Sequence, residues 1–308
     1  MVSNFNNANN LQGTGTTIVR VNSGGQQSLF YQSSNYSATG LTAALNVVQR
    51  GFVFVGSTPT LDGSPDTVQA RSLLVIDGNG NLLGSVANST LINGPWGMAV
   101  ADNGGSAHVF VSNVLSGTIT RFDVSFPVSG GVVINKAVVV GSGFNHRTDP
   151  AALVLGPSGL SFDAGHDILY VASSSDNAIY ALSGAVAAKT SLGSGRVVYS
   201  DLVHLHGPTQ LAAAPNDDLL VADSDGSNVD PNQPSEIVDF TIAGQFVDQF
   251  SVDPNNGGLS ASPSDRSAPK PFVSPLSMTM PTPSPSPRGP TSFTRMALAV
   301  PGTIEARA

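Results

Sequence analysis

The chain has 308 residues, of which 40% are hydrophobic and 11% are charged, so it can fill a hydrophobic core and its bulk is not disordered. Its formal net charge is −8 and no basic cluster is present, which argues against nucleic acid and anionic membrane surfaces as partners. The absence of Cys excludes disulfides and thiolate metal sites, and no run near twenty apolar residues predicts membrane insertion. The 33 Gly, together with much Val, Ser, Thr and Asn, indicate an all-β chain with many turns.

An apolar pattern that ends in a small polar residue recurs along the chain. It occurs as FVFVGS (52–57), HVFVSN (108–113), ILYVASS (168–174) and LLVADS (219–224). Four-stranded repeats of about fifty residues are typical of β-propeller blades. The sequence therefore predicts an all-β propeller with about five recognisable blades, the first incomplete, over residues 2–32, 41–87, 94–140, 156–200 and 207–252.

The last of these units shows its strands most clearly. Strands are predicted at 211–214, 219–222, 236–241 and 245–252, with turns at Asn216-Asp217-Asp218 and Ala243-Gly244. Strands this short with turns between them indicate an antiparallel meander. A sandwich or a barrel is the structural alternative, but neither explains a repeat of this length.

These repeats resemble bacterial six-bladed β-propellers of the NHL-repeat-like class, in particular a group of secreted or periplasmic proteins of unassigned activity. The resemblance covers roughly residues 2–256 and implies a natively six-bladed ring. It also implies a periplasmic or secreted location for the full-length protein. The same architecture carries scaffolds, lyases, lactonases and dehydrogenases, so the resemblance implies the fold and leaves the function open.

Both ends of the chain depart from that pattern. The first blade would begin with its inner strand, so we expect further residues, including a signal peptide, upstream of Met1. Ten of the 21 Pro follow residue 258, and such a composition cannot form central strands. Residues 1–258 are therefore predicted to be the propeller. Residues 259–308 are predicted to be either a Pro/Ser-rich disordered tail or a sixth blade read in a shifted frame.

A binding site is expected where the long polar loops collect. In a propeller the loops that lead into first strands and those that join second to third strands emerge on one face. On this assignment residues 4–16, 57–69, 141–155, 200–206 and 223–235 form a long-loop face, where binding usually resides. The candidate ligand-binding residues are Trp96, His146, Arg147, Asp149, Asp223 and Asp225. The alternative is that Trp96 packs in the core and that the polar residues cap turns.

Three His residues form a candidate metal site. His204 and His206 are two residues apart, so in an extended segment they would share a face, and His146 would join them from another loop. Some six-bladed lyases carry a His-ligated metal at the tunnel mouth, and His206 resembles such a position because it directly precedes an inner strand. Asn93 and Leu155 occupy the corresponding positions of other units, so a site with three such His residues is absent.

Three functions follow from these features. The first is an extracytoplasmic propeller that binds a small molecule, a glycan or a protein on the long-loop face. The second is a metal-assisted lyase or hydrolase in which a divalent cation polarises a substrate oxygen. The third is a degenerate, inactive gene product. No Gly-x-Ser-x-Gly elbow, calcium loop or phosphate-binding motif is present to favour another chemistry.

Overall fold

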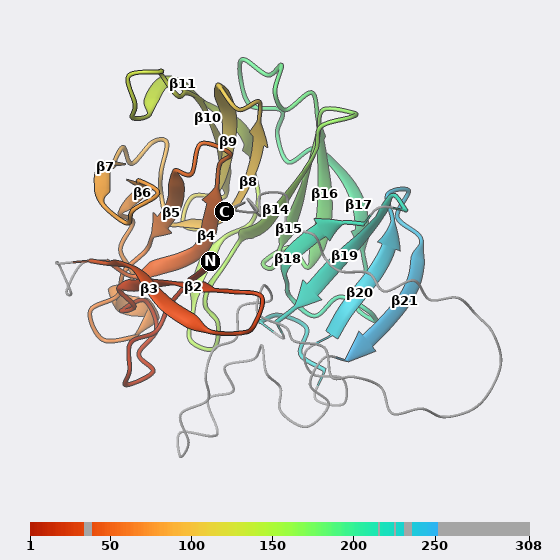
Figure 1. Ribbon diagram of the computed structural model, residues 1–308. Helices are drawn as coiled ribbons and strands as arrows, with labels where there is room; N and C mark the ends of the chain where they lie inside the picture. The colour runs from red at the N-terminus through yellow and green to blue at the C-terminus, as the bar shows by residue number, and fades with distance from the viewer. Residues whose placement is uncertain (34–38, 215, 225, 231–235, 252–308) are drawn as a thin grey trace.

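Five antiparallel sheets are arranged as blades around a common centre in the computed structural model (Figure 1). The structure describes residues 1–33, 39–214, 216–224, 226–230 and 236–251. Blade 1 contains three strands and blades 2 to 5 contain four each, paired in chain order. The predicted all-β propeller is thereby confirmed. The predicted tail, residues 259–308, lies outside the described residues.

The strands of the five blades have the following bounds. Blade 1 comprises β1 (Val2–Ser3), β2 (Thr17–Val21) and β3 (Gln27–Gln32). Blade 2 comprises β4 (Leu41–Val47), β5 (Val53–Ser57), β6 (Ser72–Ile76) and β7 (Leu82–Val86), and blade 3 comprises β8 (Pro95–Asp102), β9 (Ser106–Asn113), β10 (Thr118–Ser125) and β11 (Val133–Ser142). Blade 4 comprises β14 (Pro157–Asp163), β15 (Ile168–Ser173), β16 (Ala178–Ser183) and β17 (Arg196–Ser200). Blade 5 comprises β18 (Pro208–Ala213), β19 (Asp218–Asp223), β20 (Glu236–Thr241) and β21 (Phe246–Ser251).

Two short elements lie outside the blades. The hairpin of β12 (Arg147–Asp149) and β13 (Leu153–Leu155) interrupts the connection from blade 3 to blade 4. The 3₁₀ turn η1 (Pro65–Thr67) lies in the loop between β5 and β6, and the Ser64 side chain caps its N-terminus. The described residues include no helix long and apolar enough to span a bilayer.

The same backbone hydrogen bond closes blades 2 to 5. The residue that follows the second strand donates its N–H to the carbonyl of the Gly that precedes the first strand, at 2.8–3.1 Å. The pairs are Thr58–Gly40, Val114–Gly94, Ser174–Gly156 and Ser224–Gly207. This bond explains why a Gly precedes the first strand in each blade that carries the second-strand pattern.

The inner strands β4, β8, β14 and β18 lie side by side in that order. A Cβ on Gly97 of β8 would lie 1.8 Å from the Ser158 carbonyl oxygen of β14, and a Cβ on Gly159 would lie 2.5 Å from Gln210 Cα. Gly97 and Gly159 each end a Gly-Pro-x-Gly segment, at 94–97 and 156–159. Because they have no Cβ, they let the next blade approach closely. Most core side chains pack between neighbouring blades, and Phe54, Phe110, Phe122 and Phe240 are among the largest that are fully buried.

A buried Arg joins blade 3 to blade 4. Arg121 of β10 donates to the carbonyls of Ala185, Val186 and Ala188 at 2.6–3.0 Å. Its Nε donates to Asp123 at 2.7 Å, and Asp123 also contacts His108 Nδ1 at 2.8 Å. The guanidinium thus replaces its lost hydration with protein acceptors from two blades.

Candidate functional site

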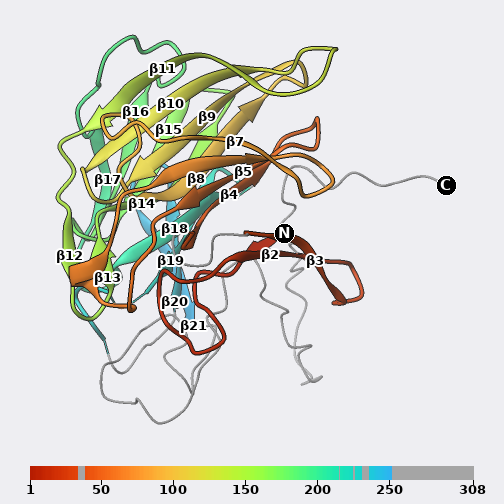
Figure 2. The same ribbon diagram turned by 90° about the vertical axis from the view of Figure 1, so that its left-hand side faces the viewer.

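The predicted long loops do meet on one face. Thr60 donates its backbone N–H to Gly13 at 2.9 Å and its hydroxyl to Gln12 at 2.5 Å, which joins residues 4–16 to residues 57–69. The β12–β13 hairpin contacts η1 in the second of these loops, and Figure 2 shows the two segments together at one end of the blades. Ser227 donates to the Ser174 carbonyl at 2.7 Å and brings in the loop of blade 5.

A buried apolar cluster lies beneath the loops of this face. Phe5, Val114, Leu153 and Val154 are buried together, and Trp96 packs against them partly buried. The rings of Trp96 and Phe5 meet edge to face with centroids 5.1 Å apart. These side chains come from blade 3, the N-terminal loop and the β12–β13 hairpin, so the cluster fastens the hairpin to the propeller. Trp96 is therefore part of the support for the long-loop face.

The hairpin carries local backbone strain. Leu153 has φ +66°, a conformation that L-residues with a branched side chain rarely adopt. The N–H of Val154 donates to the Ala152 carbonyl at 2.8 Å across it, which forms a γ-turn. The Leu153 side chain is only 2% exposed, so burial in the cluster offsets the strain.

The predicted ligand-binding residues in and beside this hairpin form hydrogen bonds and an ion pair with nearby residues. The side chain of Asp149 accepts the N–H groups of Ala151 and Ala152 at 2.9 and 3.1 Å and so forms the hairpin turn. Arg147 is exposed, lies 3.4 Å from Asp149 and donates to the Ser175 hydroxyl at 3.1 Å. His146 is exposed, with its Nδ1 3.1 Å from the Phe144 carbonyl. Arg147 and His146 are therefore accessible to a ligand on this face.

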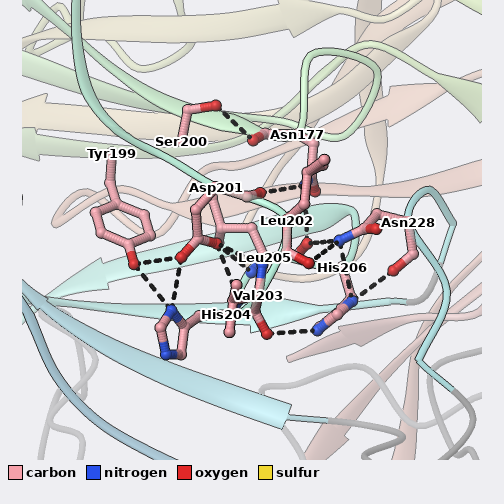
Figure 3. Close-up of polar contacts among 10 residues, drawn as sticks. All are labelled: Asn177, Tyr199, Ser200, Asp201, Leu202, Val203, His204, Leu205, His206 and Asn228. Atoms are coloured by element: carbon pink, nitrogen blue, oxygen red, sulfur yellow. Dashed lines mark hydrogen bonds and ion pairs between the residues drawn. The ribbon is translucent and has the colours of Figure 1, made fainter.

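The turn that leads into blade 5 is organised around Asp201 (Figure 3). Its Oδ1 accepts the backbone N–H groups of Val203, His204 and Leu205 at 2.9–3.2 Å. Asn177 holds the turn from blade 4, because its amide donates to the Asp201 and Leu205 carbonyls, both at 2.8 Å. An extended segment that places His204 and His206 on one face was expected here. That expectation is wrong, because the carboxylate caps a turn.

His204 is oriented by the same carboxylate. Its Nδ1 lies 2.6 Å from Asp201 Oδ2 and 3.0 Å from the Tyr199 hydroxyl, which itself donates to Asp201 at 2.6 Å. An ionised carboxylate only accepts, so Nδ1 carries the proton. The imidazole stacks on Phe246 with centroids 3.9 Å apart. Nε2 makes no hydrogen bond within the described residues, which leaves it as the ring atom able to take a ligand or a proton.

The pKa values of Asp201 and Tyr199 are both shifted strongly from their ordinary values. Burial opposes ionisation of Asp201, but hydrogen bonds from Tyr199, His204 and Leu205 outweigh it and lower its pKa to about 2. Burial, and the nearby Asp201 carboxylate, raise the pKa of Tyr199 well above its ordinary value. Asp201 is therefore an anion and Tyr199 a neutral donor throughout the physiological range.

His206 is used differently. It is only 3% exposed, its Nδ1 bonds the Asn228 carbonyl, and its Nε2 lies 3.2 Å from the Val203 carbonyl. Both ring nitrogens thus face backbone carbonyls, and Nδ1 also lies 3.3 Å from the Asn228 side-chain amide, so neither nitrogen is open to a metal ion in this arrangement. Figure 3 shows the rings of His204 and His206 engaged with different partners on the two sides of the turn.

The remaining candidates lie in blade 5. Asp223 is fully buried at the end of β19, and Glu236, also buried, begins the adjacent strand β20. Asp225 lies outside the described residues. Within the described part of the chain, no three His, Asp or Glu side chains gather closely enough to hold a metal ion. The structure therefore does not bring His146, His204 and His206 together.

Sequence reasoning missed Asp201, Tyr199, Asn177 and Asn228. A signal for Asp201 was present, because Asp three residues before His and four before a buried Leu is typical of a side-chain cap. The two Asn residues carried no such signal. They act on a segment more than twenty residues away in sequence.

Comparisons with known proteins bear on the fold. No family model matches the chain, and no curated protein matches its sequence. Among solved structures, the periplasmic gluconolactonase PpgL of Pseudomonas aeruginosa is 15% identical, with a TM-score of 0.53 over 82% of this chain and 67% of that one. Virginiamycin B lyase from Staphylococcus aureus is 14% identical, with a TM-score of 0.48 over 80% of this chain. A chain of a nidogen–laminin complex is 14% identical, with a TM-score of 0.44 over 78% of this chain and 73% of that one.

The chain spans 66% of the lyase chain, which is just under two thirds of its length. At identities this low, a structural likeness reports architecture and not activity. The comparisons therefore do not choose between the functions considered above. What the likeness to PpgL shows, together with the blade topology, is that this chain has the β-propeller fold.

Proposed function

We propose that this chain is a binding propeller that works outside the cytoplasm and uses its long-loop face. The observation that carries the proposal is the β12–β13 hairpin. Its apolar residues Leu153 and Val154 are buried in the cluster that contains Phe5, while Arg147 and His146 remain exposed. Polar groups held on a rigid apolar base lose little conformational entropy when they bind. The partner is a small molecule, a glycan or a protein.

A ligand screen with matched variants tests this proposal. Glycan arrays and a metabolite library, followed by calorimetry, would identify a ligand of the wild-type chain. Arg147→Ala should weaken its binding at least about tenfold, the usual cost of losing one charged contact. His166→Ala is the control, because His166 is exposed in the β14–β15 turn, outside the long loops. A ligand whose affinity falls equally in both variants would contradict the assignment of the face.

One observation favours a second candidate, the metal-assisted lyase or hydrolase. Asp201 orients His204 and leaves its Nε2 without a hydrogen bond in the described structure, as a metal ligand or a general base requires. A metal bound by three His residues would also need one ring nitrogen of His206 to exchange its backbone carbonyl partner for the metal.

Metal analysis separates the two candidates. Mass spectrometry of tag-free protein should find a stoichiometric divalent metal that is lost in His204→Ala if the second candidate holds. A metal-free wild-type protein that still binds its ligand supports the binding function. A folded protein with neither metal nor ligand would identify the degenerate, inactive product.

The location is tested separately. We propose that the full-length protein is periplasmic or secreted, and fractionation of cells that express it from its own locus would show it in the periplasm or the medium. Recovery from the cytoplasm alone would contradict this.

A further inference from the structure

One face of blade 5 is not covered by another blade of the described structure. Leu220, Ile237, Asp239, Asp248 and Phe250 share this face, because they alternate along β19, β20 and β21 or lie opposite one another across these strands. Leu220 and Ile237 take part in none of the hydrophobic clusters formed by the described residues, and Phe250 is 41% exposed. We call this surface the open face of blade 5.

The repeat shows how the same face is covered in other blades. Ile119 of blade 3 and Ile179 of blade 4 occupy the position of Ile237, second in the third strand, and each is fully buried against the next blade. Two residues later in blade 3, Arg121 donates to carbonyls of blade 4. Asp239 takes that position in blade 5. A segment that covers blade 5 must therefore present a donor or a cation where blade 4 presents carbonyls.

Asp239 lacks a donor for one of its oxygens. Its Oδ1 is buried and has no hydrogen-bond partner in the described part of the chain. Burial, followed by the carboxylates of Asp218 and Asp248, raises the pKa of Asp239, and Asp248 lies directly opposite it on β21. A buried oxygen without a donor costs free energy, which a cation placed against it would offset. The open face therefore combines apolar side chains with an anion suited to a cationic partner.

The chain itself contains a segment with this chemistry. Residues 252–308 follow β21 directly, so they begin at the sheet that carries the open face. Acidic residues predominate over residues 1–258, whereas residues 259–308 contain five basic residues and two acidic ones: Arg266, Lys270, Arg288, Arg295, Arg307, Asp265 and Glu305. The longest stretch without Pro after residue 258 is 291–300, Thr-Ser-Phe-Thr-Arg-Met-Ala-Leu-Ala-Val, which holds one Arg and no acid.

The spacing within that stretch matches the open face. Phe293 and Arg295 are two residues apart, as are Ile237 and Asp239. Side chains two residues apart in an extended segment point the same way, so the aromatic ring can cover Ile237 while the guanidinium meets Asp239. About forty residues connect β21 to this stretch, and at about 3.3 Å each they can reach any point of the sheet.

We propose that residues 291–300 pack on the open face of blade 5 as an extended segment, with Arg295 paired to Asp239. The segment takes the place on blade 5 that blade 4 takes on blade 3. It shields the apolar residues of the open face and gives the Asp239 carboxylate its donor. The contact involves no long loop, so it is independent of the binding function proposed above.

Engineered disulfides test the proposal, because the chain has no Cys. Thr241→Cys with Ala297→Cys places thiols two residues beyond each partner of the ion pair and keeps the pair itself. Thr241→Cys with Ala268→Cys is the matched control. Residue 268 is closer to residue 241 in sequence, so loop closure favours the control pair when the segment does not bind. We expect the Ala297 pair to oxidise at least about tenfold faster, as measured by mass spectrometry of the intramolecular disulfide.

Trypsin provides a second test on the unmodified chain. Cleavage after Arg295 should be at least about tenfold slower than cleavage after Arg266, because a bound segment must detach before it is cut. Asp239→Asn should remove this protection. Asp66→Asn, at an exposed Asp of η1 in blade 2, should retain it, and circular dichroism should show that both variants are folded.

Three results would overturn the proposal. They are oxidation of the Ala268 pair as fast as that of the Ala297 pair, equal cleavage after Arg295 and Arg266 in the wild-type chain, or equal protection in the two Asn variants. Disulfides that join two chains would also overturn it, because the open face would then bind a second copy of the chain.

Discussion

The Asp201 carboxylate lies 2.6 Å from His204 Nδ1, and the same side chain accepts three backbone N–H groups of its turn. One carboxylate therefore sets both the backbone of the turn and the direction of the imidazole. Because Nδ1 of His204 is hydrogen-bonded to Asp201, Nε2 is the ring nitrogen that can bind a ligand or a proton. The interaction with Asp201 thus distinguishes His204 from His206, although both belong to one short turn.

Replacing Asp201 by Asn should make stability less dependent on pH in acid. The folded-state pKa of Asp201 is lowered to about 2. Its contribution is therefore present above the ordinary carboxyl pKa near 4 and is lost as the pH falls toward 2. Asp201→Asn should lower the free energy of unfolding by about 2 kcal/mol at pH 6, and the difference from wild type should vanish near pH 2.

Urea unfolding of both proteins at several pH values measures this difference. Asp248→Asn is the control, since Asp248 is exposed on β21. A gap between wild type and Asp201→Asn that stays constant from pH 6 to pH 2 would show that the charge of Asp201 is unimportant.

Replacing Arg121 by Met should weaken the junction of blades 3 and 4. The variant removes the donors to Ala185, Val186 and Ala188 and leaves Asp123 without its buried guanidinium partner. We expect a loss of about 3 kcal/mol in the free energy of unfolding. Arg196→Met, at an exposed Arg on β17, should stay within about 0.5 kcal/mol of wild type. Similar losses in both variants would show that the contacts of Arg121 contribute nothing specific.

At position 153 a Gly variant should be more stable than an Ala variant, which reverses the usual order. Leu153→Ala empties a buried position and keeps a Cβ at φ +66°, so it should cost about 3 kcal/mol. Leu153→Gly loses the same packing but relieves the backbone strain, which amounts to about 1 kcal/mol. The Gly variant should therefore have the higher denaturant midpoint. An Ala variant that is the more stable of the two would show that the γ-turn is not strained.

Two Gly residues in strands should respond oppositely to Ala. Gly97→Ala places a Cβ 1.8 Å from the Ser158 carbonyl and should cost about 3 kcal/mol or more, since the inner strands must separate. Gly84→Ala meets no atom within 4 Å and should be neutral or slightly stabilising. Thermal unfolding followed by circular dichroism compares the two. Equal melting temperatures would contradict the close contact of β8 and β14.

The sequence by itself determined the strands and their repetition. Alternating apolar residues, turn residues such as Asn216-Asp217-Asp218, and the Gly-Pro pairs act over a few neighbouring positions, so β18 to β21 appear where they were predicted. The collection of long loops on one face also followed, because strand order fixes the end at which each loop emerges. The six-bladed ring remains a prediction.

Only the tertiary structure decided what the candidate side chains contact. The spacing of His204 and His206 suggested a shared ligand, but the Asp201 cap turned the first toward Tyr199, and Asn228 engaged the second. The γ-turn at Leu153 was likewise invisible, because burial among Phe5 and Val114 holds it in place. Asn228 lies 22 positions from His206, and Phe5 is far from Leu153 in the sequence. The free energy of these long-range contacts depends on how distant segments pack together, which no local pattern of residues encodes.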